Sequence, residues 1–79
     1  MNLNDIENKV AEIVGNIVLT HVEPDTLLID SGLVDSLSAV DVVLAVEREF
    51  GVKVPPSEID VYLVSVSTLA AFIAEQKGA

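Results

Sequence analysis

Ser36, in the segment LVDSLSAV, is the residue whose type and position are best suited to chemistry. A nucleophilic serine needs an adjacent base and a third group that orients this base. The only histidine, His21, lies fifteen positions earlier, and the sequence contains no G-x-S-x-G motif. A lone histidine in a loop is more often a solvated surface residue than a catalyst. We therefore expect that this chain is not an enzyme.

Ser36 has two other roles open to it, as a helix cap or as a point of attachment. As a cap it would be redundant, because Asp35 before it already occupies the better position. As an attachment point it would hold a phosphate at a helix N-terminus, where free N–H groups and the helix dipole favour negative charge. Asp35 opposes that charge locally, but it could help to orient a metal-bound donor in a modifying enzyme, which would also supply the base.

The charge balance restricts the classes of partner. The 79 residues, expected to form one domain over 1–79, carry 13 acids against 4 bases, with a net charge of -9. This charge disfavours nucleic acid, whose recognition needs a basic face, and it also disfavours insertion into anionic membranes. It suits basic protein partners, although it could simply keep a small domain soluble. We expect a monomer.

Other absences point to a simple cytoplasmic protein. There is no cysteine, so no disulfide framework or thiolate metal site can form, and we predict no metal site. No apolar stretch is long enough to span a membrane. The first residues lack the basic and apolar regions of a signal peptide.

Helical spacing of apolar residues positions Ser36 at the start of the second of three long helices. The first helix is expected over residues 4–18, with Asn4 as its cap and Glu7 completing a capping box. The second is expected over about residues 36–50, after the cap Asp35 and before the stop signal Gly51.

The connections and the last helix complete a small all-α fold. The segment THVEPDTLLIDSG, residues 20–32, reads as a long loop with apolar anchors at Leu27, Leu28 and Leu33. Two prolines after Gly51 indicate a turn, followed by a short helical or irregular segment. The last helix should start after Ser65 and fray from Glu75 onward. We predict a four-helix bundle with three long helices, a short third helix and a long loop between the first two.

The second helix has two apolar faces. At about 100° per residue, one stripe spans roughly 140–240° from Leu37 and is an ordinary core face; it contains Ala39, Val42, Val43, Val46 and Phe50. Leu37, Val40 and Leu44 fall at roughly 300–360°, on a different face. A small bundle rarely buries both, and an exposed apolar patch rimmed by charge often marks a docking site. The alternative is that the long loop covers the second stripe.

The segment GLVDSLSAVDVVLAVEREFGVKVP resembles the acyl and peptidyl carrier proteins. The hallmark of that family is a D-S-L triplet at the start of the second helix, with 4′-phosphopantetheine esterified to the serine. The resemblance extends to the acidic surface, the E-x-E-F end of that helix, the V-P turn and the final S-x-x-x-L helix. It covers essentially the whole chain.

The resemblance implies a carrier that holds acyl or aminoacyl groups as thioesters on a flexible arm. Ser36 would carry the 4′-phosphopantetheine, and Asp35 would match the motif aspartate. The docking face for partner enzymes would match Leu37, Val40, Asp41, Leu44 and Glu47. The partners would be a phosphopantetheinyl transferase, a loading enzyme and downstream synthases or transferases with basic patches.

Two departures bear on the pathway. Ser38 replaces a residue that is often acidic in fatty-acid carriers, and the segment IDVYLVSV is more apolar than its usual counterpart. SGLVDSL and VPPSEID look closer to discrete carriers, such as the D-alanyl carrier proteins or stand-alone carriers of polyketide and nonribosomal peptide pathways. The competing hypothesis is an acidic helical interaction module without a prosthetic group, in which Ser36 is only a cap or phosphosite.

Overall fold

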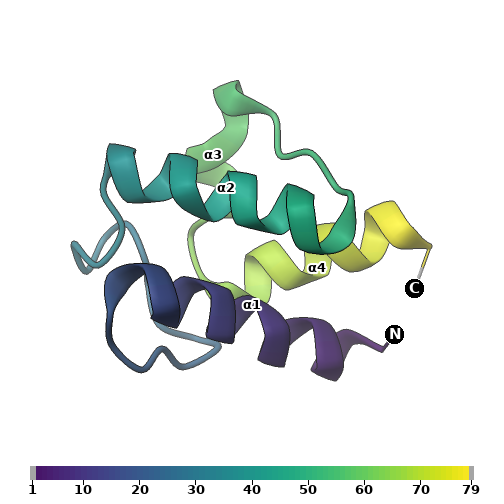
Figure 1. Ribbon diagram of the computed structural model, residues 1–79, viewed down its shortest axis with the longest axis horizontal. Helices are drawn as coiled ribbons and strands as arrows, with labels where there is room; N and C mark the ends of the chain where they lie inside the picture. Colours follow the sequence, from purple (N-terminus) through teal and green to yellow (C-terminus); the bar gives the residue numbers. More distant parts are fainter. Residues whose placement is uncertain (1, 79) are drawn as a thin grey trace.

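Four α-helices connected by loops make up the part of the chain that the structure, a computed structural model, describes, residues 2–78 (Figure 1). They are α1 (Leu3–Val18), α2 (Ser36–Phe50), α3 (Ile59–Tyr62) and α4 (Val66–Lys77), and a 3₁₀ turn, η1 (Pro56–Glu58), precedes α3. The predicted all-α fold with three long helices and a short third one is therefore confirmed. Within these residues no helix is long and apolar enough to cross a membrane.

Short polar caps explain where the helices begin. The predicted cap of the first helix, Asn4, is wrong: the cap is Asn2, whose extended backbone lets its Oδ1 accept the N–H of Asp5 at 2.9 Å. Asn4 and Glu7 consequently lie inside α1 and form no capping box. α4 begins after Ser65, as predicted, and Ser65 caps it by accepting the N–H of Thr68 at 3.1 Å.

The last turn of α4 is held in place, so the predicted fraying from Glu75 is wrong as far as the described residues extend. α4 continues to Lys77, and Gly78 follows in the left-handed conformation with φ 73°. The Lys77 Nζ donates to the Phe50 carbonyl oxygen at 3.0 Å. This contact covers an otherwise unpaired carbonyl at the C-terminus of α2, where a cation is also favoured by the helix dipole.

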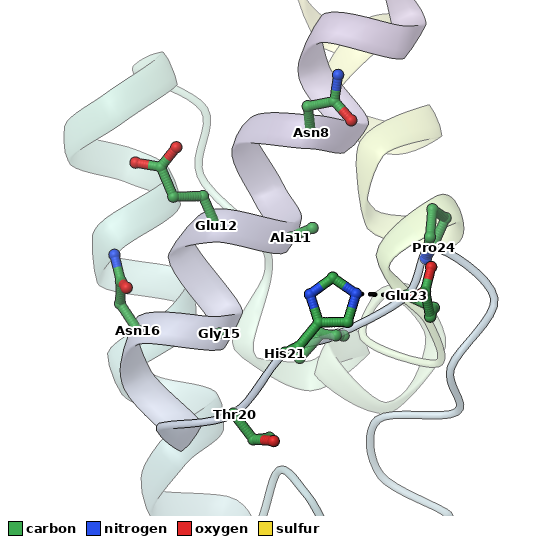
Figure 2. A pocket seen from close by; sticks show the side chains of 10 residues that line it. Asn8, Ala11, Glu12, Gly15, Asn16, Thr20, His21, Glu23 and Pro24 are labelled. Carbon is green, nitrogen blue, oxygen red and sulfur yellow. Dashed lines mark hydrogen bonds and ion pairs between the residues drawn. The ribbon is translucent and has the colours of Figure 1, made fainter.

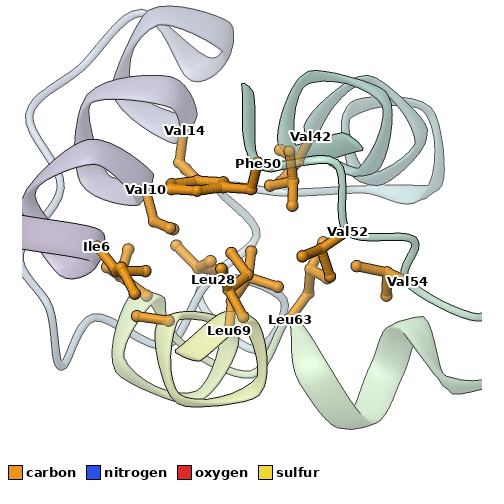
Figure 3. Packing of buried hydrophobic residues seen from close by; sticks show 14 of the residues in the cluster. Ile6, Val10, Val14, Leu28, Val42, Phe50, Val52, Val54, Leu63 and Leu69 are labelled. Carbon is orange, nitrogen blue, oxygen red and sulfur yellow. The ribbon is translucent and has the colours of Figure 1, made fainter. Parts of the chain in front are cut away.

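One hydrophobic core lies between α1, α2 and α4 (Figure 3). α1 packs against both α2 and α4. Ile6, Val10 and Val14 of α1 are fully buried, as are Val42 and Val46 of α2. Because half of the buried core side chains are valines, whose helix propensity is modest, packing against the core stabilises these helices more than local preference does.

The long loop over residues 19–35 is ordered by only part of its predicted anchors. Leu28 is fully buried, whereas Leu27 is 48% exposed and Leu33 is half-buried. The Leu28 N–H donates to the Val64 carbonyl at 2.8 Å, beside an isolated antiparallel bridge between Leu27 and Ser65. The missed residues Val22 and Val34 provide the other buried anchors.

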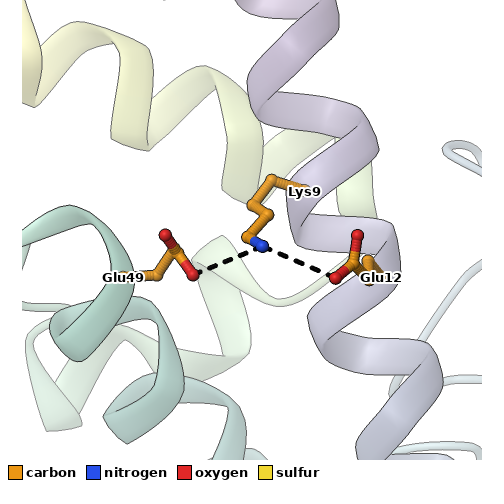
Figure 4. A network of polar contacts seen from close by, with 3 residues as sticks. All are labelled: Lys9, Glu12 and Glu49. Carbon is orange, nitrogen blue, oxygen red and sulfur yellow. Dashed lines mark hydrogen bonds and ion pairs between the residues drawn. The ribbon is translucent and has the colours of Figure 1, made fainter.

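A small ion-pair network joins α1 to α2 (Figure 4). The Lys9 Nζ lies 3.5 Å from Glu12 Oε1 and 3.4 Å from Glu49 Oε1. The carboxylates of Glu12 and then Glu49 raise the pKa of Lys9 above its ordinary value. One of the four bases is thereby used to connect two helices.

Candidate functional site

Ser36 is the first residue of α2 and is exposed. Asp35 takes the cap position, as predicted: its Oδ1 accepts the N–H of Leu37 at 3.1 Å and that of Ser38 at 2.9 Å. These bonds, with the Ser38 N–H contributing most, hold the pKa of the Asp35 carboxyl below its ordinary value. The cap therefore stays ionised at neutral pH, and the neighbouring hydroxyl of Ser36 is not needed for this role.

A cleft of about 390 Å³ opens beside Ser36, between the start of α2 and the η1–α3 segment. Apolar side chains and two carboxylates line it: Ile29, Val34, Asp35, Ser36, Ala39, Pro56, Ile59 and Asp60. Residues from three separate parts of the chain thus meet next to the serine. No local sequence pattern indicates this cleft, because its far wall is brought there only by the tertiary fold.

The two apolar stripes of α2 are separated as predicted. Val42 and Val46 are fully buried, whereas Leu37, Val40 and Leu44 are 79%, 50% and 48% exposed. The alternative that the long loop covers the second stripe is wrong, since that loop is anchored through Val22, Leu28 and Val34. Among the other residues of the predicted docking face, Asp41 is exposed and Glu47 is half-buried.

A groove runs along this exposed stripe. Its volume is about 500 Å³, and its two walls are formed by α2 and by the segment from Lys53 to Ile59. Its lining is Val40, Val43, Leu44, Glu47, Lys53, Val54, Pro55, Pro56 and Ile59. Val43, which the helical projection placed on the core stripe, is half-buried and lines this groove. The V-P-P sequence was the only signal of the second wall.

A third cleft, of about 520 Å³, lies on the outer side of α1 (Figure 2). His21 belongs to this cleft, where its Nε2 lies 2.8 Å from Glu23 Oε1 with both side chains mostly exposed. Ser36 does not line it, and His21 does not line the cleft beside Ser36. The structure therefore does not bring the only histidine and the candidate serine to one site.

An exposed serine at a capped helix start, within a small acidic four-helix fold, is the arrangement expected of a carrier protein. The chain belongs to the family of acyl and peptidyl carrier proteins, because the family model described as "Phosphopantetheine attachment site" matches residues 4–73. Proteins of this family are carriers and not catalysts, and their prosthetic group is covalently attached 4′-phosphopantetheine.

Several curated relatives bear the same family name. The acyl carrier protein of Streptomyces coelicolor is 32% identical over 73 residues, which span 92% of this chain and 78% of the relative. That of Acidothermus cellulolyticus is 36% identical over 62 residues, spanning 75% and 74% of the two chains. A D-alanyl carrier protein of Bacillus pumilus is 32% identical over 57 residues, spanning 72% of each.

The residues around Ser36 fit such a prosthetic group. The serine side chain is exposed, so a second enzyme can reach it. The adjoining cleft is open to the surface and mostly apolar, which gives a flexible arm a place to lie beside its attachment point. Of the two carboxylates in the cleft, Asp35 is engaged in capping the helix, and no histidine lines the cleft.

Proposed function

We propose that this chain, as a single domain over 1–79, carries acyl or aminoacyl groups on 4′-phosphopantetheine attached to Ser36. The observation that carries the proposal is the D-S-L start of α2, where Asp35 caps the helix and leaves the Ser36 hydroxyl exposed and free of that role. When attached, the arm supplies the thiol on which a cargo is held as a thioester.

Each neighbouring residue has a distinct part in this proposal. Asp35 fixes the first turn of α2, so that Ser36 meets the modifying enzyme in one orientation, and it can help to orient that enzyme's metal-bound donor. Leu37, Val40 and Leu44 provide the exposed apolar contact for partner enzymes. Asp41 and Glu47 provide negative charge beside it, which suits basic patches on those enzymes.

The partners we propose are a phosphopantetheinyl transferase, a loading enzyme and the downstream enzymes of one of several pathways. The relatives named above include acyl carrier proteins and a D-alanyl carrier protein. Fatty-acid, polyketide, nonribosomal-peptide and D-alanylation pathways all use carriers of this kind. We propose that the protein is a monomer, since a net charge of -9 opposes self-association. We also propose that it acts in the cytoplasm.

The intact mass of the protein tests this proposal. After incubation with coenzyme A, Mg²⁺ and a broad-specificity phosphopantetheinyl transferase, the wild type should gain the mass of one phosphopantetheine. Ser36→Ala should gain none and keep its helical circular dichroism spectrum. Ser38→Ala, two residues further along the same turn, is the matched control and should be modified like the wild type.

The exposed apolar stripe supports a second candidate, an acidic interaction module in which Ser36 is only a cap or phosphosite. This candidate predicts that the wild type gains no phosphopantetheine under the same conditions. Modification of Ser36→Ala would instead mean that the attachment residue has been assigned wrongly.

A further inference from the structure

The groove between α2 and the Lys53–Ile59 segment has charges of opposite sign on its two walls. Glu47 lies on the α2 wall, and Lys53 lies on the opposite wall. Within residues 2–78 the contacts closer than 4.0 Å between a basic and an acidic side chain involve Lys9 and His21, so neither Glu47 nor Lys53 is paired. The groove therefore presents an apolar floor with one unpaired negative and one unpaired positive rim.

Lys53 stands out because bases are rare in this protein. Of the four bases, Lys9 joins α1 to α2 and Lys77 donates to the Phe50 carbonyl. Arg48 lines a separate hollow with Ile13, Ala45 and Glu49. Lys53 is the one base that lines the groove. The net charge alone would attract a purely basic partner, and Lys53 weakens that attraction.

We propose that this groove takes an amphipathic helix of a partner enzyme, with an apolar row flanked by bases facing Glu47 and by acids facing Lys53. The inference rests on the proposed carrier function, because a carrier must be recognised by separate enzymes. The inference adds two features to the predicted docking stripe: a second wall formed by the Lys53–Ile59 segment, and a requirement that the partner helix carry an acidic flank.

The composition of the groove selects a helix over an extended peptide. An extended peptide binds by adding main-chain hydrogen bonds to an exposed backbone edge. Two neighbouring residues of the outer wall are Pro55 and Pro56, which have no N–H to donate. A helix satisfies its own backbone and needs only an apolar groove for its side chains.

Charge also argues against a second copy of the chain as the occupant. Two molecules of net charge -9 repel each other, and their second helices carry the same acidic residues. A partner with both basic and acidic flanks meets the groove without this repulsion, and it gains specificity because a wrongly oriented helix would place like charges together.

Two helical peptides of about 15 residues, a length that alanine-rich helices need for stability, test the inference. Both carry the same leucine row. The mixed probe has arginines on one flank and glutamates on the other, and the basic probe has arginines on both. Each is titrated into the labelled protein at about 0.15 M salt while NMR shifts are followed. The mixed probe should bind and shift the signals of Val40, Leu44 and Val54.

Two charge reversals form a matched pair, because Lys53→Glu and Arg48→Glu change the net charge equally. Lys53→Glu should weaken the mixed probe about two- to fivefold, the range of one exposed ion pair, and strengthen the basic probe. Arg48→Glu should not weaken the mixed probe. Equal effects of the two reversals on both probes, or no binding of the mixed probe, would overturn the inference.

The two proposals fail separately. Peptide binding needs neither Ser36 nor a prosthetic group, whereas the mass gain does not depend on which flank of a partner faces Lys53. Modification of Ser36 without mixed-probe binding would remove the groove and leave the carrier function. Mixed-probe binding without modification of Ser36 would remove the carrier function and leave the groove as a binding site for a helix.

Discussion

Truncating one side chain on each stripe of α2 separates its core from its docking face. Val46 is fully buried, and Val46→Ala removes two carbons worth about 0.8 kcal/mol each in transfer from water. The remaining cavity raises the expected loss of unfolding free energy to about 2–3 kcal/mol. Leu44 is 48% exposed, so Leu44→Ala loses only about half of its transfer energy and leaves no closed cavity. We expect a loss of about 1 kcal/mol.

Urea denaturation followed by circular dichroism measures both losses. For a domain of this size, 1 kcal/mol corresponds to about 4–8 °C in melting temperature, so the two variants should also separate clearly on heating. The rate of phosphopantetheine transfer should show the opposite order. Leu44→Ala should lower kcat/KM several-fold, whereas Val46→Ala should leave it near the wild-type value while the protein remains folded. If Leu44→Ala proved the more destabilising of the two, the assignment of the faces would be refuted.

Two further predictions concern helix ends, the start of α2 and the end of α1. The pKa of Asp35 is lowered by folding, so its contribution to stability is present above its unfolded pKa of about 3.9 and is lost as the pH falls through the lower folded value. Below about pH 4 the wild type should therefore lose stability relative to Asp35→Asn, and parallel stability curves would contradict this. Leu19 adopts φ 62° at the end of α1 and is 87% exposed, so Leu19→Gly should relieve left-handed strain and stabilise the protein by about 0.5–1 kcal/mol; a lower denaturation midpoint would contradict the assignment of strain.

Local signals were sufficient for α2. Asp35 and Gly51 mark its ends through contacts made within one turn, which short-range chemistry determines. The separation of Val46 from Leu44 follows from helical geometry alone and needs no knowledge of neighbours. The serine and its capping aspartate were therefore predictable, as was the exposed stripe beside them.

Features that depend on segments far apart in the sequence were not predictable in this way. Leu28 rather than Leu27 is buried because its N–H bonds to Val64, in a distant part of the chain. The order of the last turn depends on Lys77 reaching Phe50. The groove needs the Lys53–Ile59 segment to lie along α2. Each of these is a tertiary contact for which the local sequence carries no periodic signal.

The contact between Lys77 and Phe50 has a practical consequence for anyone who immobilises or fuses this protein. It holds the last turn of α4 against the end of α2 farthest from Ser36, and the first turn of α1 lies at the same end of the molecule (Figure 1). The 15 residues of α2 span about 20 Å at 1.5 Å per residue. A surface tether, fluorophore or fusion partner joined at either of these helix ends would therefore leave the serine end facing outward and unobstructed.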